Sequence, residues 1–271
     1  MSQLESARTA VVTGAGAGIG AATVAHLRRQ GYEVIGMDLR GADVECDVTD
    51  EASLTQAAAV VAERWQGRLD ALVVNAGVNA PAPITLAVNY FGAVDTVEAC
   101  APLLAAGNNP RVSFTVSGAA FQPFFSPELV ELLLADKRDA ALALGAKLGE
   151  QGEHEGYKNY SSSKQALAKW IRRMAPTERW AGRGIALNAV CPGVVETPMT
   201  KELLATPEGR EEVLRHMPAP LNGAAKAADI AAVHAFLVSA ENNHMAGQIL
   251  AVDGGYEVLT RGEDAVSQGS F

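Results

Sequence analysis

The sequence predicts an α/β fold, in which one doubly wound parallel sheet of about seven strands has helices on both faces. Two observations favour this fold class. Short apolar runs alternate with longer helical stretches, as in β-α-β units whose strands are buried on both faces. A glycine-rich turn, Thr13 to Gly20, joins the first apolar run directly to the first helix. At 271 residues and 48% hydrophobic content the chain can bury one large core, so residues 1–271 are expected to form a single domain.

Start and stop signals define the elements in order. The first helix ends before Gly31, and the second, which Thr49 or Asp50 can cap, ends near residue 67. Apolar runs bounded by turn residues predict strands at residues 10–12, 33–38, 44–46, 69–74, 112–116, 185–191 and 248–252. Apolar periodicity predicts further helices at residues 85–106, 160–182 and 227–239, with helical pieces around 207–215. A polar tail is expected at about 256–271.

The alternation of strands and helices breaks between residues 121 and 159, where a helical insert is expected. Ser126 and Pro127 can start one helix, and an alanine- and leucine-rich segment continues through Leu148. A polar link is expected at 149–156. The insert is too short to own a core, so it is expected to form a wall or lid over a pocket.

Composition excludes several classes of protein. The net charge is -9 and the basic residues are scattered, so nucleic acid is not an expected partner. The sequence lacks a signal-peptide pattern and an apolar run long enough to span a membrane, so a cytoplasmic protein without membrane contact is expected. The three cysteines and five histidines form no ligand pattern, and no metal is predicted.

The glycine-rich turn is a candidate phosphate cradle. It can place the free N–H groups of the first helix against a pyrophosphate without a Cβ in the way, although a simple tight turn is the alternative. Asp38 ends the second strand, where a carboxylate suits an adenosine ribose and repels a 2′-phosphate. Ala17 and Leu39 are neutral where a phosphate site needs a cation, so NAD is predicted over NADP, unless Asp38 is an ordinary acid at a strand end.

A second constellation is the Y-S-S-S-K segment from Tyr160 to Lys164. Positions i and i+4 share one face of a helix, so the ammonium group lies beside the phenol. A neighbouring cation favours the phenolate, and the pair can therefore act as a general acid and base.

With these motifs the chain resembles the classical short-chain dehydrogenase/reductase family, whose fold is Rossmann-type, from Thr9 to Tyr256. The family's motifs occur in order, as Thr13-Gly14 with Gly18 and Gly20, Asp47-Val48, Asn75-Ala76-Gly77, Asn89, Tyr160 with Lys164, Pro192-Gly193 with Thr197, Gln248 and Val252-Asp253-Gly254-Gly255.

The resemblance implies hydride transfer between NAD and a secondary alcohol or ketone. Tyr160 would move the hydroxyl proton, and Lys164 would lower its pKa and hold the nicotinamide ribose. Ser117 would polarise the substrate oxygen, and Asn89 would hold a water behind Lys164. The cofactor-binding residues implied, besides Tyr160 and Lys164, are Gly14, Gly18, Ile19, Gly20, Asp38, Leu39, Asp47, Val48, Asn75, Ala76, Gly77, Pro192, Gly193, Val195 and Thr197.

The choice of serine has alternatives. The family usually places its serine about a dozen residues before the tyrosine, whereas here the insert separates Ser117 from Tyr160. Ser117 is chosen because the segment from Phe114 to Phe121 looks like the fifth strand of dihydrodiol dehydrogenases. Ser113 is an alternative, and a register that puts Gly118 at this position would leave no serine at all.

The insert and tail look most like those of bacterial 3α-hydroxysteroid dehydrogenase/carbonyl reductases. The expected substrate is therefore an apolar, cyclic secondary alcohol or ketone. The pocket residues expected are Phe121, Phe124, Phe125, Met199, Leu203 and Leu204, for which ordinary core packing is the alternative. A homodimer through the last helix and strand, or a homotetramer, is expected. A non-catalytic NAD(H)-binding sensor or scaffold on the same fold is the competing function.

Overall fold

A computed structural model describes residues 7–266 and contains a seven-stranded sheet in the order β3-β2-β1-β4-β5-β6-β9. Each pairing in this sheet is parallel, which confirms the predicted fold class. The strands are β1 Thr9–Thr13, β2 Glu33–Asp38, β3 Val44–Glu45, β4 Ala71–Val74, β5 Arg111–Thr115, β6 Ala186–Pro192 and β9 Ile249–Val252. Two short strands, β7 Val195–Glu196 and β8 Ala225–Lys226, pair with each other.

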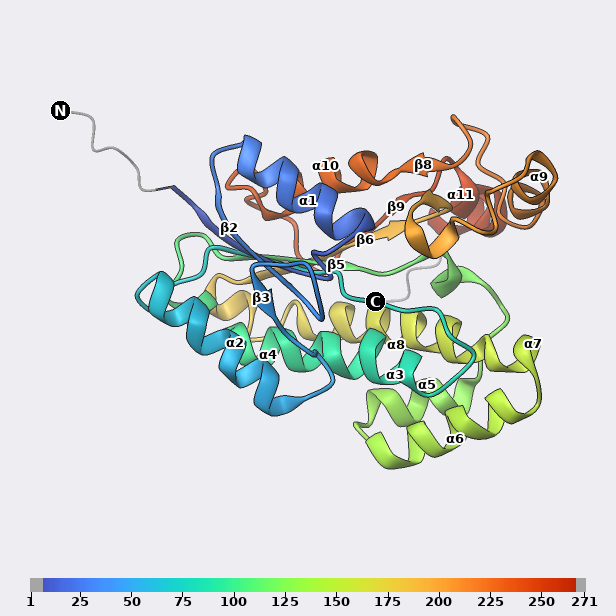
Figure 1. Ribbon diagram of the computed structural model, residues 1–271, viewed down its shortest axis with the longest axis horizontal. Helices are drawn as coiled ribbons and strands as arrows, with labels where there is room; N and C mark the ends of the chain where they lie inside the picture. The colour runs from blue at the N-terminus through green and yellow to red at the C-terminus, as the bar shows by residue number, and fades with distance from the viewer. Residues whose placement is uncertain (1–6, 267–271) are drawn as a thin grey trace.

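Helices cover both faces of the sheet (Figure 1). On one face lie α1 Gly18–Arg29 and α10 Ala227–Val238. The other face carries α2 Glu51–Arg64, α4 Ala93–Ala105 and α8 Lys158–Met174. The strand order reverses between β1 and β4. In such sheets the ligand-binding crevice lies at the carboxyl ends of the strands beside this reversal.

Two predicted helices differ from the structure. The helix expected at 85–106 is divided into α3 Ile84–Leu86, a π-helical segment Ala87–Gly92 and α4. The helix expected at 160–182 begins earlier and ends at Met174, because Pro176 follows and a proline disfavours helical geometry in the residue before it. This proline is a local sequence signal for the end of α8.

The insert is helical and packs on the main core. It forms α5 Pro127–Leu134, α6 Arg138–Glu150 and α7 Glu153–Gly156, seen at the lower right of Figure 1. The α5 N-cap is Ser126, whose hydroxyl accepts from the Leu129 amide, as the sequence indicated. The polar link expected at 149–156 is wrong, because α6 extends to Glu150 and α7 follows directly. Leu129 and Leu133 are fully buried in the same core as the sheet.

The last part of the chain also reaches the carboxyl ends of the strands. After α9 Pro207–His216, the chain passes through α10 and β9 into a short helix, α11 Tyr256–Arg261. The polar tail expected at 256–271 thus begins as a helix, and residues 267–271 lie outside the described part of the chain. The Asp253 carboxylate caps α11 by accepting from the amides of Gly255 and Glu257. Within residues 7–266 no helix is long and apolar enough to cross a membrane.

Candidate active site

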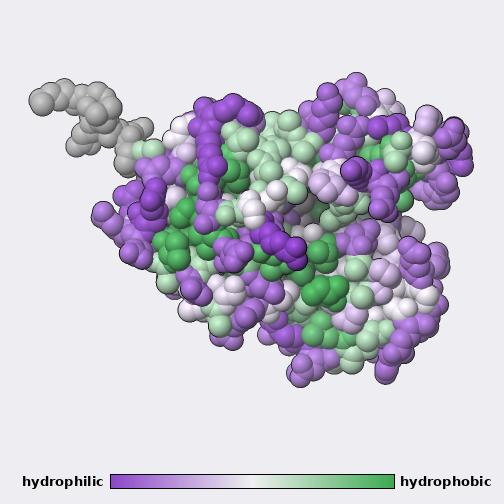
Figure 2. Space-filling model, in the orientation of Figure 1, coloured by the Kyte–Doolittle hydropathy of each residue, from purple (hydrophilic) through white to green (hydrophobic). Residues whose placement is uncertain are grey.

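A cavity of about 380 Å³ opens at the carboxyl ends of the central strands. Figure 2 shows the surface hollowed between the part that carries α9 and the part that carries the insert. The lining brings together site residues from distant parts of the sequence, namely Gly14, Gly18, Ile19, Asp38, Leu39, Asp47, Val48, Asn75, Ala76, Gly77, Ser117, Tyr160, Lys164, Pro192, Gly193, Val195, Thr197 and Met199. Gly20 and Asn89 are buried next to this lining rather than in it.

The glycine loop has backbone contacts that other residues would break. Gly14 and Gly18 have φ angles of +66° and +54°, in the left-handed region. A Cβ on Gly20 would lie 1.9 Å from the carbonyl oxygen of Gly14. The first turn of α1 has no side-chain cap and no acidic residue. The backbone N–H groups of this turn therefore remain free to bind an anion in the cavity.

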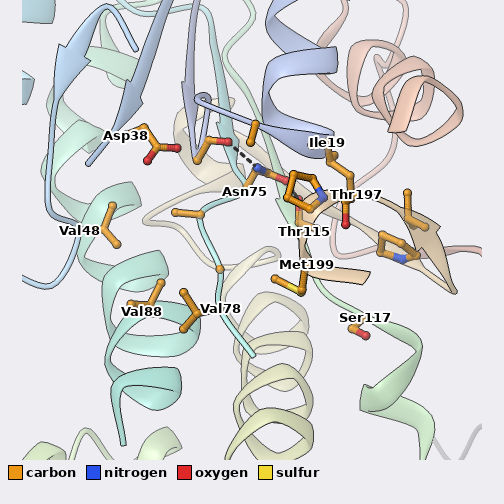
Figure 3. A pocket seen from close by; sticks show the side chains of 18 of the residues that line it. Ile19, Asp38, Val48, Asn75, Val78, Val88, Thr115, Ser117, Thr197 and Met199 are labelled. Atoms are coloured by element: carbon orange, nitrogen blue, oxygen red, sulfur yellow. Dashed lines mark hydrogen bonds between the residues drawn. The ribbon is translucent and has the colours of Figure 1, made fainter. Parts of the chain in front are cut away.

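One end of the cavity is acidic. Asp38 lies there, at the end of β2, and Ser117 lies at the other end (Figure 3). One oxygen of the Asp38 carboxylate accepts from the Gly16 amide at 2.9 Å, which leaves the other oxygen for a ligand. Among the described residues that line the cavity, Lys164 is the only basic one, and its ammonium lies beside the Tyr160 ring. The residues present therefore fit the adenosine end of a dinucleotide.

The adjacent acid, Asp47, is used differently. Its Oδ1 accepts from the Thr49 amide at 2.8 Å and from the Thr49 hydroxyl at 2.7 Å. The carboxylate therefore stabilises the turn that leads into α2, while Val48 presents an apolar side chain beside it.

The tyrosine and lysine come together on α8 as the spacing indicated. The Lys164 ammonium lies 5.9 Å from the centroid of the Tyr160 ring and donates to the carbonyl oxygen of Thr115 at 3.0 Å. Burial lowers the pKa of Lys164 to about 8. Burial also raises the pKa of Tyr160, and the facing Ser117 side chain opposes this rise only in part. The pKa of Tyr160 is therefore raised overall, because desolvation outweighs the Ser117 hydrogen bond, and a lowering of this pKa by Lys164 stays a prediction.

The structure distinguishes the candidate serines. Ser117 lines the cavity and caps a 3-10 turn, Gly118–Phe121, by accepting from the amide of Ala119 at 3.2 Å. Ser113 is fully buried, with its hydroxyl 2.8 Å from Nδ1 of His234. Ser117 is thus the serine that faces Tyr160, and the Gly118 register does not apply.

Asn89 acts as a backbone clamp. It lies in the π-helical segment, where its Oδ1 accepts from the Val78 amide at 2.8 Å. Its amide group donates to the Val78 carbonyl at 2.9 Å and to the Ser163 hydroxyl at 3.3 Å. Both of its N–H groups are therefore used, and a water held by Asn89 stays a prediction.

Only one of the six expected substrate-pocket residues, Met199, lines the cavity. Met199 lines the cavity and is 50% exposed, but the cavity does not extend to Phe121, Phe124, Phe125, Leu203 or Leu204. The Phe124 ring packs 4.4 Å from His154, between ring centroids. The Ser161 hydroxyl donates to the Phe124 carbonyl at 2.5 Å and ties the start of the insert to α8. Sequence reasoning gave no role to Ser161.

Several lining residues were missed by sequence reasoning. They share a place next to a recognised motif or at a strand end, and they are Ala17, Met37, Cys46, Val78, Val88, Thr115, Val116, Pro198 and Thr200. Beside Ser117, a Cβ on Gly118 would meet Met217 at 3.0 Å and Tyr256 at 3.4 Å. The turn at Ser117 is therefore covered by the end of α9 and the start of α11. Among the described residues, no three His, Cys, Asp or Glu side chains gather to hold a metal.

Two family models match consecutive parts of the chain. One, described as short chain dehydrogenase, matches residues 8–128, and the other, described as Enoyl-(Acyl carrier protein) reductase, matches residues 128–257. Together they cover the sheet, the insert and the cavity.

Individual relatives are similar over nearly their full lengths. A 3-alpha-hydroxysteroid dehydrogenase/carbonyl reductase from Comamonas testosteroni is 32% identical, with 93% of this chain and 97% of the relative covered. A cis-4-hydroxycyclohexanecarboxylate dehydrogenase from Sinomonas cyclohexanicum is also 32% identical, over 96% of this chain and 100% of the relative. The crystal structure of a 3-alpha-hydroxysteroid dehydrogenase from Pseudomonas sp. B-0831 complexed with NADH has a TM-score of 0.82 and 36% identity, covering 94% of this chain and 99% of that one.

Proposed function

Because the chain belongs to the short-chain dehydrogenase/reductase family, we propose that it is an NAD-dependent oxidoreductase. The proposed reaction interconverts an apolar, cyclic secondary alcohol and its ketone by hydride transfer. The observation that carries this proposal is the position of Tyr160, Lys164 and Ser117 at one end of a cavity whose other end carries Asp38.

The proposed cofactor site runs along the glycine loop. The first turn of α1 would bind the pyrophosphate, and Asp38 would accept from the adenosine ribose. Residues 192–197 would bind the nicotinamide carboxamide, and Lys164 its ribose. When bound, NAD supplies the acceptor for the hydride. Preference for NAD over NADP is inferred from the Asp38 carboxylate, which would repel a 2′-phosphate, and from the NADH named for the Pseudomonas relative.

The proposed proton chemistry belongs to Tyr160. Its pKa is raised by burial, so the phenol is protonated near neutral pH and can donate to the oxygen of a ketone as that oxygen gains charge. In the oxidative direction the phenolate must accept the hydroxyl proton, and this form becomes more populated as pH rises. Ser117 would donate a hydrogen bond to the same oxygen.

An apolar, cyclic substrate is supported by the lining and by the relatives. Met199, Val78 and Val88 present apolar side chains to the cavity. The similar proteins are named for steroid and cyclohexanecarboxylate substrates. We extend the proposal to a homo-oligomer, a dimer or a tetramer, because β9 forms an edge of the sheet and Phe236 on α10 is 44% exposed.

The test is nicotinamide reduction by the purified protein with NAD or NADP and a panel of steroid, monocyclic, aromatic-diol and acyclic alcohols. Tyr160→Phe is expected to lower kcat by about 10²-fold to 10⁴-fold while NADH still binds. Oxidation by the unaltered protein should speed up from about pH 6 to about pH 9, whereas ketone reduction should change little, because a phenol whose pKa is raised stays protonated over this range.

Tyr32→Phe is the matched control, since it removes the same hydroxyl from a ring beside Arg8, outside the cavity lining. Turnover that survives in Tyr160→Phe would contradict the assignment. Tight NADH binding without turnover of any alcohol would instead support the sensor or scaffold function.

A further inference from the structure

A buried histidine on helix α10 contacts β5, the strand whose carboxyl end lies at the candidate active site. His234 lies on α10 and is fully buried. Its Nδ1 is 2.8 Å from the Ser113 hydroxyl, and its Nε2 is 3.1 Å from the Thr115 hydroxyl. Ser113 and Thr115 lie two residues apart on β5, so both point to the same face of the sheet. The proposed reaction gives this ring no role.

Hydrogen bonds connect Thr115 to the glycine loop and to Lys164. The Thr115 hydroxyl donates to Oδ1 of Asn75 at 2.9 Å. The Asn75 amide donates in turn to the carbonyl oxygens of Thr13 at 3.2 Å and Gly14 at 3.3 Å, in the glycine loop. The Thr115 carbonyl accepts from the Lys164 ammonium. One residue therefore links His234 to the glycine loop and to Lys164.

The donor and the acceptor of each hydrogen bond between His234 and the glycine loop can be deduced. The Asn75 NH₂ group faces two carbonyl oxygens, so its own oxygen faces Thr115. A carboxamide oxygen carries no proton, so Thr115 must donate to it. A hydroxyl has one proton, so the contact between Thr115 and His234 is a hydrogen bond only if Nε2 of the ring is protonated.

The other ring nitrogen then follows. With the proton on Nε2, Nδ1 of a neutral ring is an acceptor, and the Ser113 hydroxyl donates to it. Burial lowers the pKa of His234 to about 3, so the ring is neutral near neutral pH. Each polar atom of the ring therefore has a partner in one tautomer.

We propose that His234 is a positioning residue of this active site, a neutral ring protonated at Nε2 that fixes the side chain of Thr115. Held in this way, Thr115 keeps Asn75 against the glycine loop and keeps its carbonyl beneath Lys164. Helix α10, which contributes no residue to the cavity lining, thus controls the geometry of the cofactor loop and of the ammonium. The functional readout of this inference rests on the proposed dinucleotide binding, whereas the tautomer does not.

The tautomer is measured first, by nitrogen NMR of protein labelled at its 5 histidines. The His234 signals are assigned as those missing from His234→Gln. The expected result is a protonated Nε2 and an unprotonated Nδ1, with no titration between about pH 5 and about pH 9. A proton on Nδ1, or a titration in this range, would overturn the proposal whether or not the protein binds NADH.

The functional test compares two amide variants by their NADH dissociation constants. The amide of His234→Gln reaches the position of Nε2 and can still donate to Thr115, whereas that of His234→Asn reaches only the position of Nδ1. His234→Asn is expected to weaken NADH binding about tenfold, and His234→Gln by less than about threefold. Equal losses in the two variants would contradict the proposal, because only the Gln amide can still donate to Thr115.

Thr115→Val keeps the test decisive if the histidine variants fail to fold. This substitution removes the hydroxyl that links His234 to Asn75, and it should also weaken NADH binding about tenfold. Thr96→Val is its matched control, because Thr96 is buried and donates to the Gly92 carbonyl at 2.6 Å, outside the chain from His234 to the glycine loop. A loss in Thr96→Val as large as in Thr115→Val would overturn the proposal. Failure of the unaltered protein to bind NADH would refute the proposed function and leave the NMR result to decide the role of His234.

Discussion

The glycine loop and the start of the insert are held in place by different kinds of contact. On the proposed cofactor side, at the glycine loop, backbone meets backbone: a Cβ on Gly20 would lie 1.9 Å from the Gly14 carbonyl oxygen, and one on Gly14 would lie 2.8 Å from the Cα of Ala76. On the proposed substrate side, the start of the insert is joined to α8 by the side chains of Ser161 and Ser162, which bond the backbone of Phe124 and Ser126. Backbone meets backbone in the insert only farther along, where Gly149 and Gly156 approach the carbonyl oxygen of Pro81.

The two kinds of contact differ in how many substitutions they tolerate. Where two backbones touch, a substitution must move a main chain, so few residue types are tolerated. Where a side chain meets a backbone, a substitution loses one hydrogen bond or leaves a small gap, which costs less. The glycine loop is therefore fixed, while the junction between the start of the insert and α8 tolerates more residue types.

The largest effect is expected for Gly20→Ala. The added methyl group would overlap the Gly14 carbonyl, so the variant should lose more than about 4 kcal/mol of unfolding free energy or fail to bind NADH. Urea denaturation and NADH titration measure the two outcomes.

Gly31→Ala is the matched control for this substitution. Gly31 has a φ of +85° with nothing within 4 Å of the added Cβ, so Gly31→Ala carries only backbone strain of about 1–2 kcal/mol. If Gly20→Ala were as mild as Gly31→Ala, the contrast between the two sides of the cavity would fail.

A smaller effect is expected at the other end of the cofactor side. Asp38→Asn keeps an oxygen for the Gly16 amide but removes the charge that would repel a 2′-phosphate. The preference for NAD over NADP, measured as a ratio of kcat/KM values, should fall by about tenfold or more. Asp43→Asn is the control, because Asp43 also accepts a backbone N–H, from Gly36, but does not line the cavity. An unchanged ratio in Asp38→Asn would show that Asp38 does not select the cofactor.

The same contrast explains which parts of the site the sequence could predict. The glycine loop, Asp38, Tyr160 and Lys164 were predictable because their arrangement depends on local geometry: a strand end, a tight turn and helical spacing. These elements need no knowledge of distant contacts. Once the strands are parallel and adjacent, their carboxyl ends bring these residues into one cavity.

The rest depends on contacts between segments far apart in the chain. The backbone of Phe124 is held by Ser161, and nothing near Phe124 in the sequence signals this bond. Tyr256 lies in a stretch that reads as polar tail, yet it packs beside Gly118. His234 shows no motif, and its role follows only from its two neighbours on β5. Tertiary contacts of this kind outweigh local pattern on the substrate side.

The smallest effect is expected for Ser161→Ala, which removes the bond to Phe124 and leaves the cofactor side untouched. The variant should lose about 1 kcal/mol of unfolding free energy. Hydrogen exchange should become faster in α5 and α6, because the start of the insert is less restrained. The KM for the alcohol should change by about twofold to fivefold while the NADH dissociation constant stays the same. Ser239→Ala, which removes an exposed hydroxyl bond to the Phe236 carbonyl, is the control. A changed affinity for NADH with no change in exchange would mean that the two sides of the cavity are not separable in this way.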